Sequence, residues 1–245
     1  MMAIQWARLG LLVLLGPIYF IYIAFLAPMC RARAGFRGWF WRRVKRACSR
    51  MLWLLSIRCD TSAAARAALA GDENSIIVVN HRSHLDGFAL MDVIPDQKWF
   101  TFGGKKELFD SFLLRRGFAG AGLVEIDRKS GKLALETMTR AVQEMPVRRS
   151  LLLFPEGTRA GGREMGDFKP GAVLIARATG RSIRPIVIMD ADDLLPRDRV
   201  LPKAGVIRIE VLEAFHCDRA DSVQEDVNRL HAAMRSVFEG TVPGL

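Results

Sequence analysis

Short apolar runs alternate with longer amphipathic stretches through most of the chain, a pattern typical of alternating strands and helices. The short runs are rich in β-branched residues and predict strands near 75–79, 122–126, 150–154, 183–188 and 205–212. The longer stretches predict helices near 84–92, 131–144, 171–179 and 222–238. This order predicts an α/β fold with a mostly parallel sheet flanked by helices. The last strand alternates apolar and polar residues, so we expect it at an edge or half exposed.

The N-terminal part of the chain follows a different pattern. Leu9 to Pro28 is apolar and uncharged, and a run of ~20 such residues can span the ~30 Å of a bilayer core or lie in one leaflet. A cleaved signal peptide is disfavoured, because the basic residues follow the apolar run instead of preceding it. These basic residues are Arg31, Arg33, Arg37, Arg42, Arg43, Lys45, Arg46 and Arg50. The positive-inside rule then predicts an inner or cytoplasmic membrane protein whose main domain faces the cytoplasm.

Residues Phe36 to Ile57 form a basic amphipathic stretch in which tryptophans and arginines are interleaved. Such a stretch is typical of a helix on an anionic lipid surface. The alternative is a helix packed on the main domain with a solvated basic face. We favour lipid contact, and divide the chain into a membrane anchor with its amphipathic helix over 1–60 and an α/β domain over 61–245.

Composition agrees with a membrane partner. The formal net charge is +10, and half of the residues are hydrophobic. A basic chain can also bind nucleic acid, but no nucleic-acid motif is visible and the cations are concentrated beside the apolar anchor. We therefore expect anionic phospholipid, and no nucleic acid, as the partner. The four cysteines lack metal-ligand spacing, and a cytoplasmic domain would keep them reduced.

A histidine and an aspartate follow the first predicted strand. A histidine side chain in water has a pKa of ~6.5, so a residue of this type at position 81 can accept a proton near neutral pH. Asp86 can fix the tautomer of His81 and stabilise the imidazolium, provided that the two side chains meet. Ser83 and Asp86 fit a helix-capping pattern, which would bring a strand-end residue and a first-turn residue together. In the alternative interpretation Asp86 only caps a helix. A metal site at His81, His84 and Asp86 is less favoured, because no Cys- or Glu-rich segment accompanies them.

A second strand, Leu151 to Phe154, runs directly into Pro155-Glu156-Gly157-Thr158-Arg159. In a parallel sheet this strand end shares an edge with His81. Together with Gly122–Arg128 and Phe168–Ala172, these residues resemble the glycerolipid acyltransferase family. The resemblance covers about residues 70 to 190.

Each motif of that family has a counterpart in the same order. The H-x4-D block is carried by His81 and Asp86, and the F-P-E-G-T-R block is present unaltered as Phe154 to Arg159. Similar blocks are found at Lys105–Leu108, Gly122–Arg128 and Ile183–Val187. The chain departs from the family pattern at Glu125, Ala160 and Arg184, which can mark a subfamily with a different acceptor lipid.

The resemblance implies transfer of a fatty acyl group from acyl-CoA or acyl-carrier protein to the free hydroxyl of a lysophospholipid. The preferred acceptor is 1-acylglycerol-3-phosphate, which gives phosphatidic acid. His81 would be the general base and Asp86 its orienting partner. No G-x-S-x-G nucleophile elbow is present, so we expect no covalent acyl-enzyme, and neither a cofactor nor a metal. The expected substrate-binding residues are Lys105, Arg128, Glu156, Gly157, Thr158 and Arg159.

Three other functions stay open. One is an acyltransferase for a different lyso-lipid, such as a lyso-ornithine lipid. The second is a non-catalytic membrane lipid-binding protein in which the motif residues are structural. The third is a metal-dependent hydrolase that uses the histidines as ligands.

Overall fold

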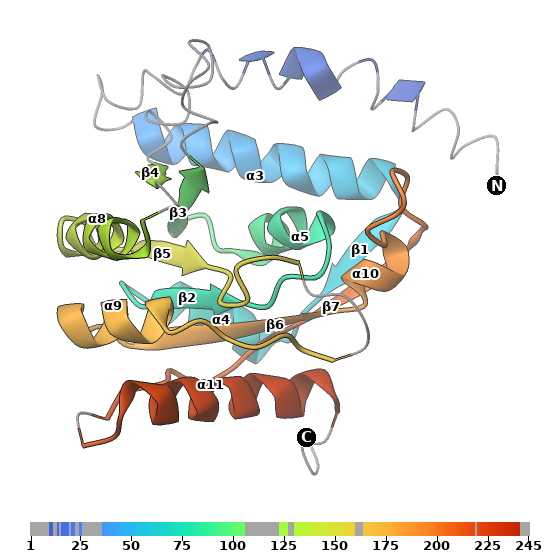
Figure 1. Cartoon of the computed structure of the whole chain (residues 1–245). Helices are drawn as coiled ribbons and strands as arrows, with labels where there is room; N and C mark the ends of the chain where they lie inside the picture. Colours follow the sequence, from blue (N-terminus) through green and yellow to red (C-terminus); the bar gives the residue numbers. More distant parts are fainter. Residues whose placement is uncertain are drawn as a thin grey trace.

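The structure, a computed structural model, describes residues 10–11, 14, 16–19, 21–22, 25, 36–105, 123–126, 130–159, 164–218 and 220–240 (Figure 1). Seven strands in these residues form one sheet in the order β1-β7-β6-β2-β5-β3-β4. Neighbouring strands run parallel, except that β6 and β7 are antiparallel. The predicted α/β class with a mostly parallel sheet is confirmed. The strands are β1 (Ile57–Asp60), β2 (Ile76–Val79), β3 (Trp99–Lys105), β4 (Val124–Ile126), β5 (Arg149–Leu153), β6 (Ile183–Met189) and β7 (Gly205–Val211).

Most of the predicted elements are present. The described helices are α3 (Phe36–Leu54), α4 (Ala63–Gly71), α5 (Leu85–Val93), α8 (Gly131–Gln143), α9 (Gly171–Thr179), α10 (Ala191–Leu194) and α11 (Val223–Phe238). Strands β1 and β3 and the helices α4 and α10 are not among the predicted elements. β7 is half exposed, as its alternation indicates, but it lies between β1 and β6 instead of at an edge.

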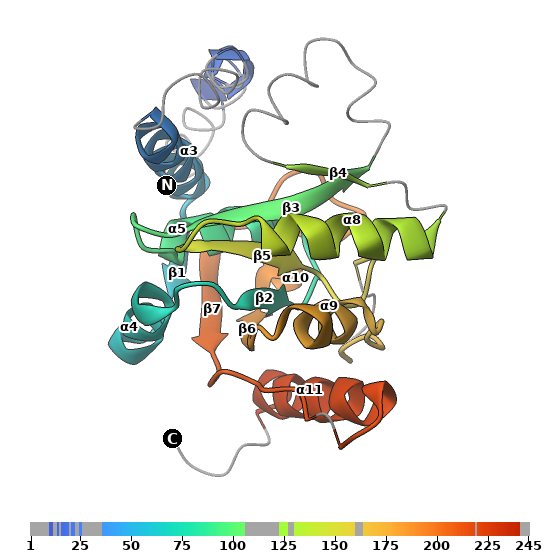
Figure 2. The same ribbon diagram turned by 90° about the vertical axis from the view of Figure 1, so that its left-hand side faces the viewer.

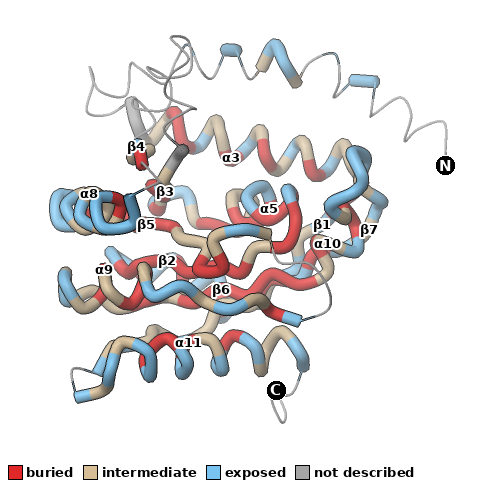
Figure 3. The backbone as a smooth tube through the Cα atoms, in the orientation of Figure 1, coloured by how far each residue is buried: buried red, intermediate tan, exposed pale blue. Residues whose placement is uncertain are grey.

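Alternation along β2 divides the core into two layers (Figures 2 and 3). Ile77 and Val79 pack in one cluster with residues of α3, α4, α5 and α10. Ile76 and Val78 pack on the opposite face with residues of α8, α9 and α11. All four β2 side chains are fully buried, as expected for a central parallel strand covered on both faces.

Helix α3 packs on the domain through its apolar face. Phe40 and Trp41 are buried beside Met91 of α5, and Lys45 donates to the carboxylate of Asp96 at 2.8 Å. Protein therefore covers the apolar face, as the alternative interpretation of this helix expected. The exposed basic side chains of α3 include Arg42, Arg46 and Arg50, and their contact with anionic lipid stays a prediction.

Half of the apolar N-terminal segment, Leu9 to Pro28, lies outside the described residues. Within the described residues, no helix has both the length and the apolar character that crossing a membrane requires. Tyr19 donates its hydroxyl to the carbonyl of Arg43 at 3.1 Å, so part of this segment lies beside α3. The expected anchor remains a prediction.

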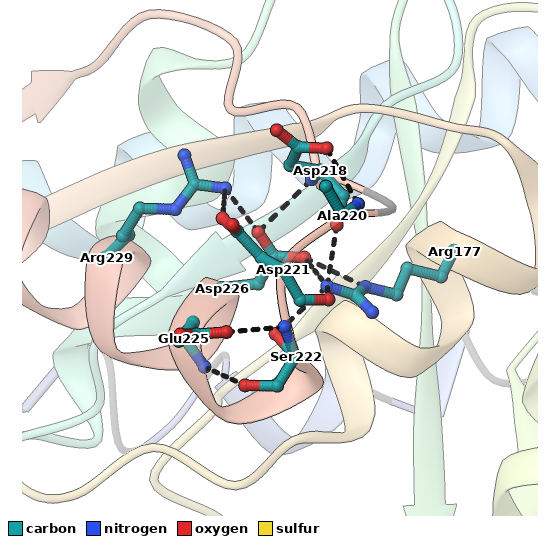
Figure 4. A network of polar contacts seen from close by, with 8 residues as sticks. All are labelled: Arg177, Asp218, Ala220, Asp221, Ser222, Glu225, Asp226 and Arg229. Atoms are coloured by element: carbon teal, nitrogen blue, oxygen red, sulfur yellow. Dashed lines mark hydrogen bonds and ion pairs between the residues drawn. The ribbon is translucent and has the colours of Figure 1, made fainter.

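A buried carboxylate joins α9 to α11 on the face of the sheet opposite to α3 (Figure 4). Asp226 is fully buried and accepts hydrogen bonds from Arg177 of α9 and from Arg229 of its own helix. At the start of α11, Ser222 and Glu225 form a reciprocal capping box. These contacts fix α11 across the sheet.

A second buried polar cluster ties together the amino ends of four strands. Lys98 precedes β3 and donates to the carboxylate of Asp72 at 2.7 Å and to the hydroxyl of Ser150 at 3.0 Å. Arg184 of β6 also contacts Asp72, at 3.3 Å, so this departure from the family pattern has a structural role. Burial lowers the pKa of Lys98. Burial also acts to raise the pKa of Asp72, but the bonds from Lys98 and Ser75 outweigh it, and the net pKa is lowered.

We expect Lys98→Met to lower the free energy of unfolding by about 3–5 kcal/mol, because it leaves a buried carboxylate without its main partner. Asp72→Asn combined with Lys98→Met should cost less than Lys98→Met alone. The lowered pKa of Asp72 means that its contribution is present above its unfolded pKa and is lost as the pH falls through the folded pKa. Chemical unfolding at several pH values measures both effects. Equal losses in the single and double variants would contradict this account.

Candidate active site

The site begins where β2 ends, and Asn80 fixes this end to β6. Its side-chain amide donates to the carbonyl of Ile188 at 2.8 Å and accepts from the Ile188 N–H at 2.7 Å. Asn80 is almost completely buried. These two bonds between Asn80 and Ile188 take the place of two strand hydrogen bonds, so the chain leaves the sheet at a fixed point. The next residue is His81.

His81 and Asp86 meet, as the sequence predicts. The imidazole Nδ1 lies 2.8 Å from Asp86 Oδ2. The same oxygen accepts from the backbone N–H groups of Arg82 at 2.7 Å and Ser83 at 2.8 Å. Asp86 therefore closes the turn before α5 and also holds the imidazole. The expected cap at Ser83 is wrong, because the N-cap of α5 is His84, which makes no side-chain cap hydrogen bond. Because an ionised carboxylate only accepts hydrogen bonds, Nδ1 carries the proton and Nε2 is left as a base.

The F-P-E-G segment after β5 holds His81 from two sides. The ring of Phe154 stacks on the imidazole with centroids 4.1 Å apart. Glu156 Oε1 accepts the His81 backbone N–H at 3.0 Å. Strand β5 pairs with β2 in parallel, with Val78 opposite Leu153. The predicted shared edge of the two strands is therefore confirmed.

Glu156 has contacts that the sequence did not predict. We expected it to bind substrate, yet its described hydrogen bond is to the main chain of His81. Its Oε2 is buried without a hydrogen-bond partner among the described residues. Burial raises the pKa of Glu156, against the His81 N–H and the positive charge of Arg82. The carboxylate therefore supports the loop that carries the histidine.

Arg82 is a buried cation of the site that sequence reasoning missed. Its guanidinium donates to Asp192 of α10 at 2.6 and 2.8 Å and to the carbonyl of Glu164 at 2.8 Å. It also lies over the ring of Phe238, 4.9 Å from the centroid. The residue adjoins His81, but nothing in its spacing distinguishes a buried arginine from a solvated one.

The G-T-R residues continue this edge of the site. Gly157 has φ +76°, and a Cβ there would lie 2.7 Å from the ammonium nitrogen of Lys169. Thr158 is exposed and Arg159 is partly exposed. The pKa of His84 is lowered by its own burial and then by the charge of Arg159. Arg159 therefore lies close enough to His84 to affect its pKa.

The side chains of two expected cationic ligands, Lys105 and Arg128, are not described by the structure. Lys105 is the last residue of β3, so its backbone lies at the carboxyl end of a strand that runs parallel to β5. Arg128 lies outside the described residues. Their roles in binding a phosphate stay predictions.

The metal interpretation has no support in the described geometry. Among the residues that the structure describes, no three His, Cys, Asp or Glu side chains are grouped so that they could hold one ion. His81 faces Asp86, and His84 is exposed.

Comparison with known proteins gives a family match over the site. A model of the acyltransferase family matches residues 57–189, more than half of the chain. A protein described as a chloroplast 1-acyl-sn-glycerol-3-phosphate acyltransferase of Arabidopsis thaliana is 27% identical over 153 residues, 62% of this chain and 42% of that protein. The Escherichia coli K12 protein described as a 1-acyl-sn-glycerol-3-phosphate acyltransferase is 28% identical over 173 residues, 70% of this chain and 68% of that protein. The match thus spans less than half of the plant relative.

One solved structure has the same fold. The 1-acyl-sn-glycerophosphate acyltransferase of Thermotoga maritima matches with a TM-score of 0.76 at 19% identity, over 100% of this chain and 97% of that one. At this identity the likeness concerns the fold alone. It agrees with the helix-flanked, mostly parallel sheet described above.

Replacement of Gly157 tests how tightly Lys169 packs on the loop. Gly157→Ala and Gly180→Ala both place a side chain at positive φ, which costs about 1–2 kcal/mol, but nothing lies within 4 Å of a Cβ at Gly180. We expect Gly157→Ala to lower the free energy of unfolding by about 1 kcal/mol more than Gly180→Ala does, because Lys169 must move. Thermal unfolding measures both losses, and Gly157→Ala with Lys169→Ala should remove the excess. An excess that persists in the double variant would show that Lys169 is not its cause.

Proposed function

The chain belongs to the acyltransferase family, and we propose that it transfers a fatty acyl group from a thioester to the free hydroxyl of 1-acylglycerol-3-phosphate, giving phosphatidic acid. The observation that carries this proposal is the 2.8 Å contact between His81 Nδ1 and Asp86 Oδ2, which leaves Nε2 as the base. Several relatives that match the chain are named as 1-acyl-sn-glycerol-3-phosphate acyltransferases, which supports the choice of acceptor.

The mechanism that we propose is direct attack. The acceptor hydroxyl oxygen attacks the thioester carbonyl while its proton moves to His81 Nε2. The carbon–sulfur bond then breaks, and the thiolate of the donor takes the proton from the imidazolium. Asp86 stabilises the imidazolium through Nδ1–H. General-base catalysis of this kind typically contributes ~10²–10⁴ in rate, and no acyl-enzyme forms.

We assign the acceptor phosphate to the cations Arg159, Arg128 and Lys105. Arginine binds phosphate through paired, charge-assisted hydrogen bonds, which suits Arg159 and Arg128. We propose Lys105 as a further cation for the phosphate, and Gly157 and Thr158 as residues that also contact the acceptor. The donor is acyl-CoA or acyl-carrier protein. We place the enzyme at an inner or cytoplasmic membrane rich in anionic phospholipid, with its main domain facing the cytoplasm.

A panel of lyso-lipids tests this function. Purified full-length chain, labelled acyl thioester and a set of acceptors should give phosphatidic acid from 1-acylglycerol-3-phosphate. His81→Ala should lower turnover by at least about a hundredfold, while thermal unfolding stays close to that of the wild type. Turnover only with another acceptor, such as a lyso-ornithine lipid, would contradict the substrate. Binding without turnover would indicate a lipid-binding protein, and loss of activity with a chelator a metal-dependent hydrolase.

Asp86→Asn separates orientation of the histidine from closure of the turn. The amide oxygen can still accept the backbone N–H groups of Arg82 and Ser83, so we expect a loss of about 1–2 kcal/mol in unfolding free energy. Turnover should fall much more, by ~10²–10⁴, because the imidazolium loses its counter-charge. Adding His81→Ala should reduce turnover little further, since the two residues act as one unit. A turnover loss no larger than the stability loss would return Asp86 to a capping role.

A further inference from the structure

The loop from 196 to 204, between α10 and β7, exposes apolar residues at its tip. Val200 is 90% exposed, the largest fraction for a large hydrophobic residue in the described part of the chain, and Leu201 is 48% exposed. The loop also carries three exposed cations and one exposed carboxylate. The charged residues are Arg197, Asp198, Arg199 and Lys203. Apolar side chains flanked by cations favour the head-group region of an anionic bilayer over water.

Backbone contacts hold this loop at both of its ends. At its start, the carbonyl of Leu195 accepts the hydroxyl of Ser83, a residue of the H-x4-D block, at 2.9 Å. At its end, Gly205 donates to the carbonyl of Ser56 at 3.2 Å, just after α3. Inside the loop, Lys203 donates its N–H to the carbonyl of Leu194 at 2.8 Å. The tip is therefore presented by a tethered loop that connects the site to the C-terminal end of α3.

The end of α3 adds side chains of the same chemistry. Trp53 is 61% exposed, and Arg50 and Arg58 are exposed. Figure 1 shows the loop rising beside this end of α3. Tryptophan favours the boundary between hydrocarbon and water, and arginine attracts anionic head groups. We call Trp53, Val200, Leu201, Arg50, Arg197 and Arg199 the loop surface.

We propose that the loop surface inserts into the head-group region of an anionic phospholipid bilayer, as a lipid contact separate from the N-terminal segment. Because the loop follows Leu195, whose carbonyl is bonded to Ser83 in the turn after His81, this contact brings the carboxyl edge of the sheet to the lipid. The inference rests on the proposed function, since a lysophospholipid acceptor reaches the site from a membrane. The loop surface carries a net positive charge, so its lipid partner is anionic.

An environment-sensitive fluorophore at position 200 tests the contact in the full chain. Val200→Cys is labelled in a Cys30→Ser background and reconstituted on vesicles of phosphatidylcholine and phosphatidylglycerol. Burial raises the pKa of Cys48 and Cys59 to about 12 and that of Cys217 to about 11, which favours labelling of the new thiol at neutral pH. Val147→Cys is the matched control, because Val147 is 60% exposed in the turn before β5, at the opposite edge of the sheet.

We expect the label at position 200 to shift to shorter wavelength and to lose at least half of its intensity to a quencher attached to the lipid. The label at position 147 should change little. Arg197→Gln with Arg199→Gln should reduce the quenching at position 200 severalfold. A label at position 200 that stays in water, or that behaves like the label at position 147, overturns the inference, as does equal quenching on purely zwitterionic vesicles.

The measurement does not depend on turnover. A chain that fails the lyso-lipid panel but shows the difference between positions 200 and 147 would lose the proposed function and keep the lipid contact. A chain that passes the panel without that difference would lose the lipid contact alone.

Discussion

The arrangement of the site depends on one oxygen atom, Oδ2 of Asp86. It accepts two backbone N–H groups of the turn before α5 and the Nδ1–H of His81. The group that shapes the turn is thus also the group that orients the imidazole, and the carboxylate is almost fully buried. A buried carboxylate needs such donors, because an unpaired charge in the interior is costly. The requirement for partners and the geometry of the base are therefore satisfied by the same contacts.

The sequence predicted this meeting because the two residues belong to different elements. Five positions apart on one helix, the side chains would point ~140° away from each other. His81 instead follows a strand, and Asp86 lies in the first turn of a helix. Strand β3 was missed because its Phe-Thr-Phe-Gly-Gly run has no strong β-branched pattern. The contact of Glu156 with the His81 main chain was missed because main-chain partners leave no trace in residue type.

Polar residues at the two ends of the sheet have different tasks. At the amino ends, Asp72, Lys98 and Arg184 are paired and hold neighbouring strands in place. At the carboxyl ends, Glu156 and Asp86 each keep one buried oxygen without a described partner. The closed network holds neighbouring strands together, whereas the two incompletely paired carboxylates adjoin His81, where a ligand can complete their hydrogen bonds. The departure at Arg184 thus belongs to the structural end of the sheet, which weakens the case that it marks a different acceptor.

Hydrogen bonds link the turn that carries His81 to an exposed loop of the domain. Arg82 pairs with Asp192 of α10, and Ser83 bonds to Leu195 at the start of the next loop. That loop returns to the sheet at Gly205, beside the end of α3. Any contact that positions the loop is therefore only a few bonded residues from His81. An enzyme that acts on a bilayer lipid, as we propose for this chain, gains from this arrangement, because the same short segment can meet the lipid surface and support His81.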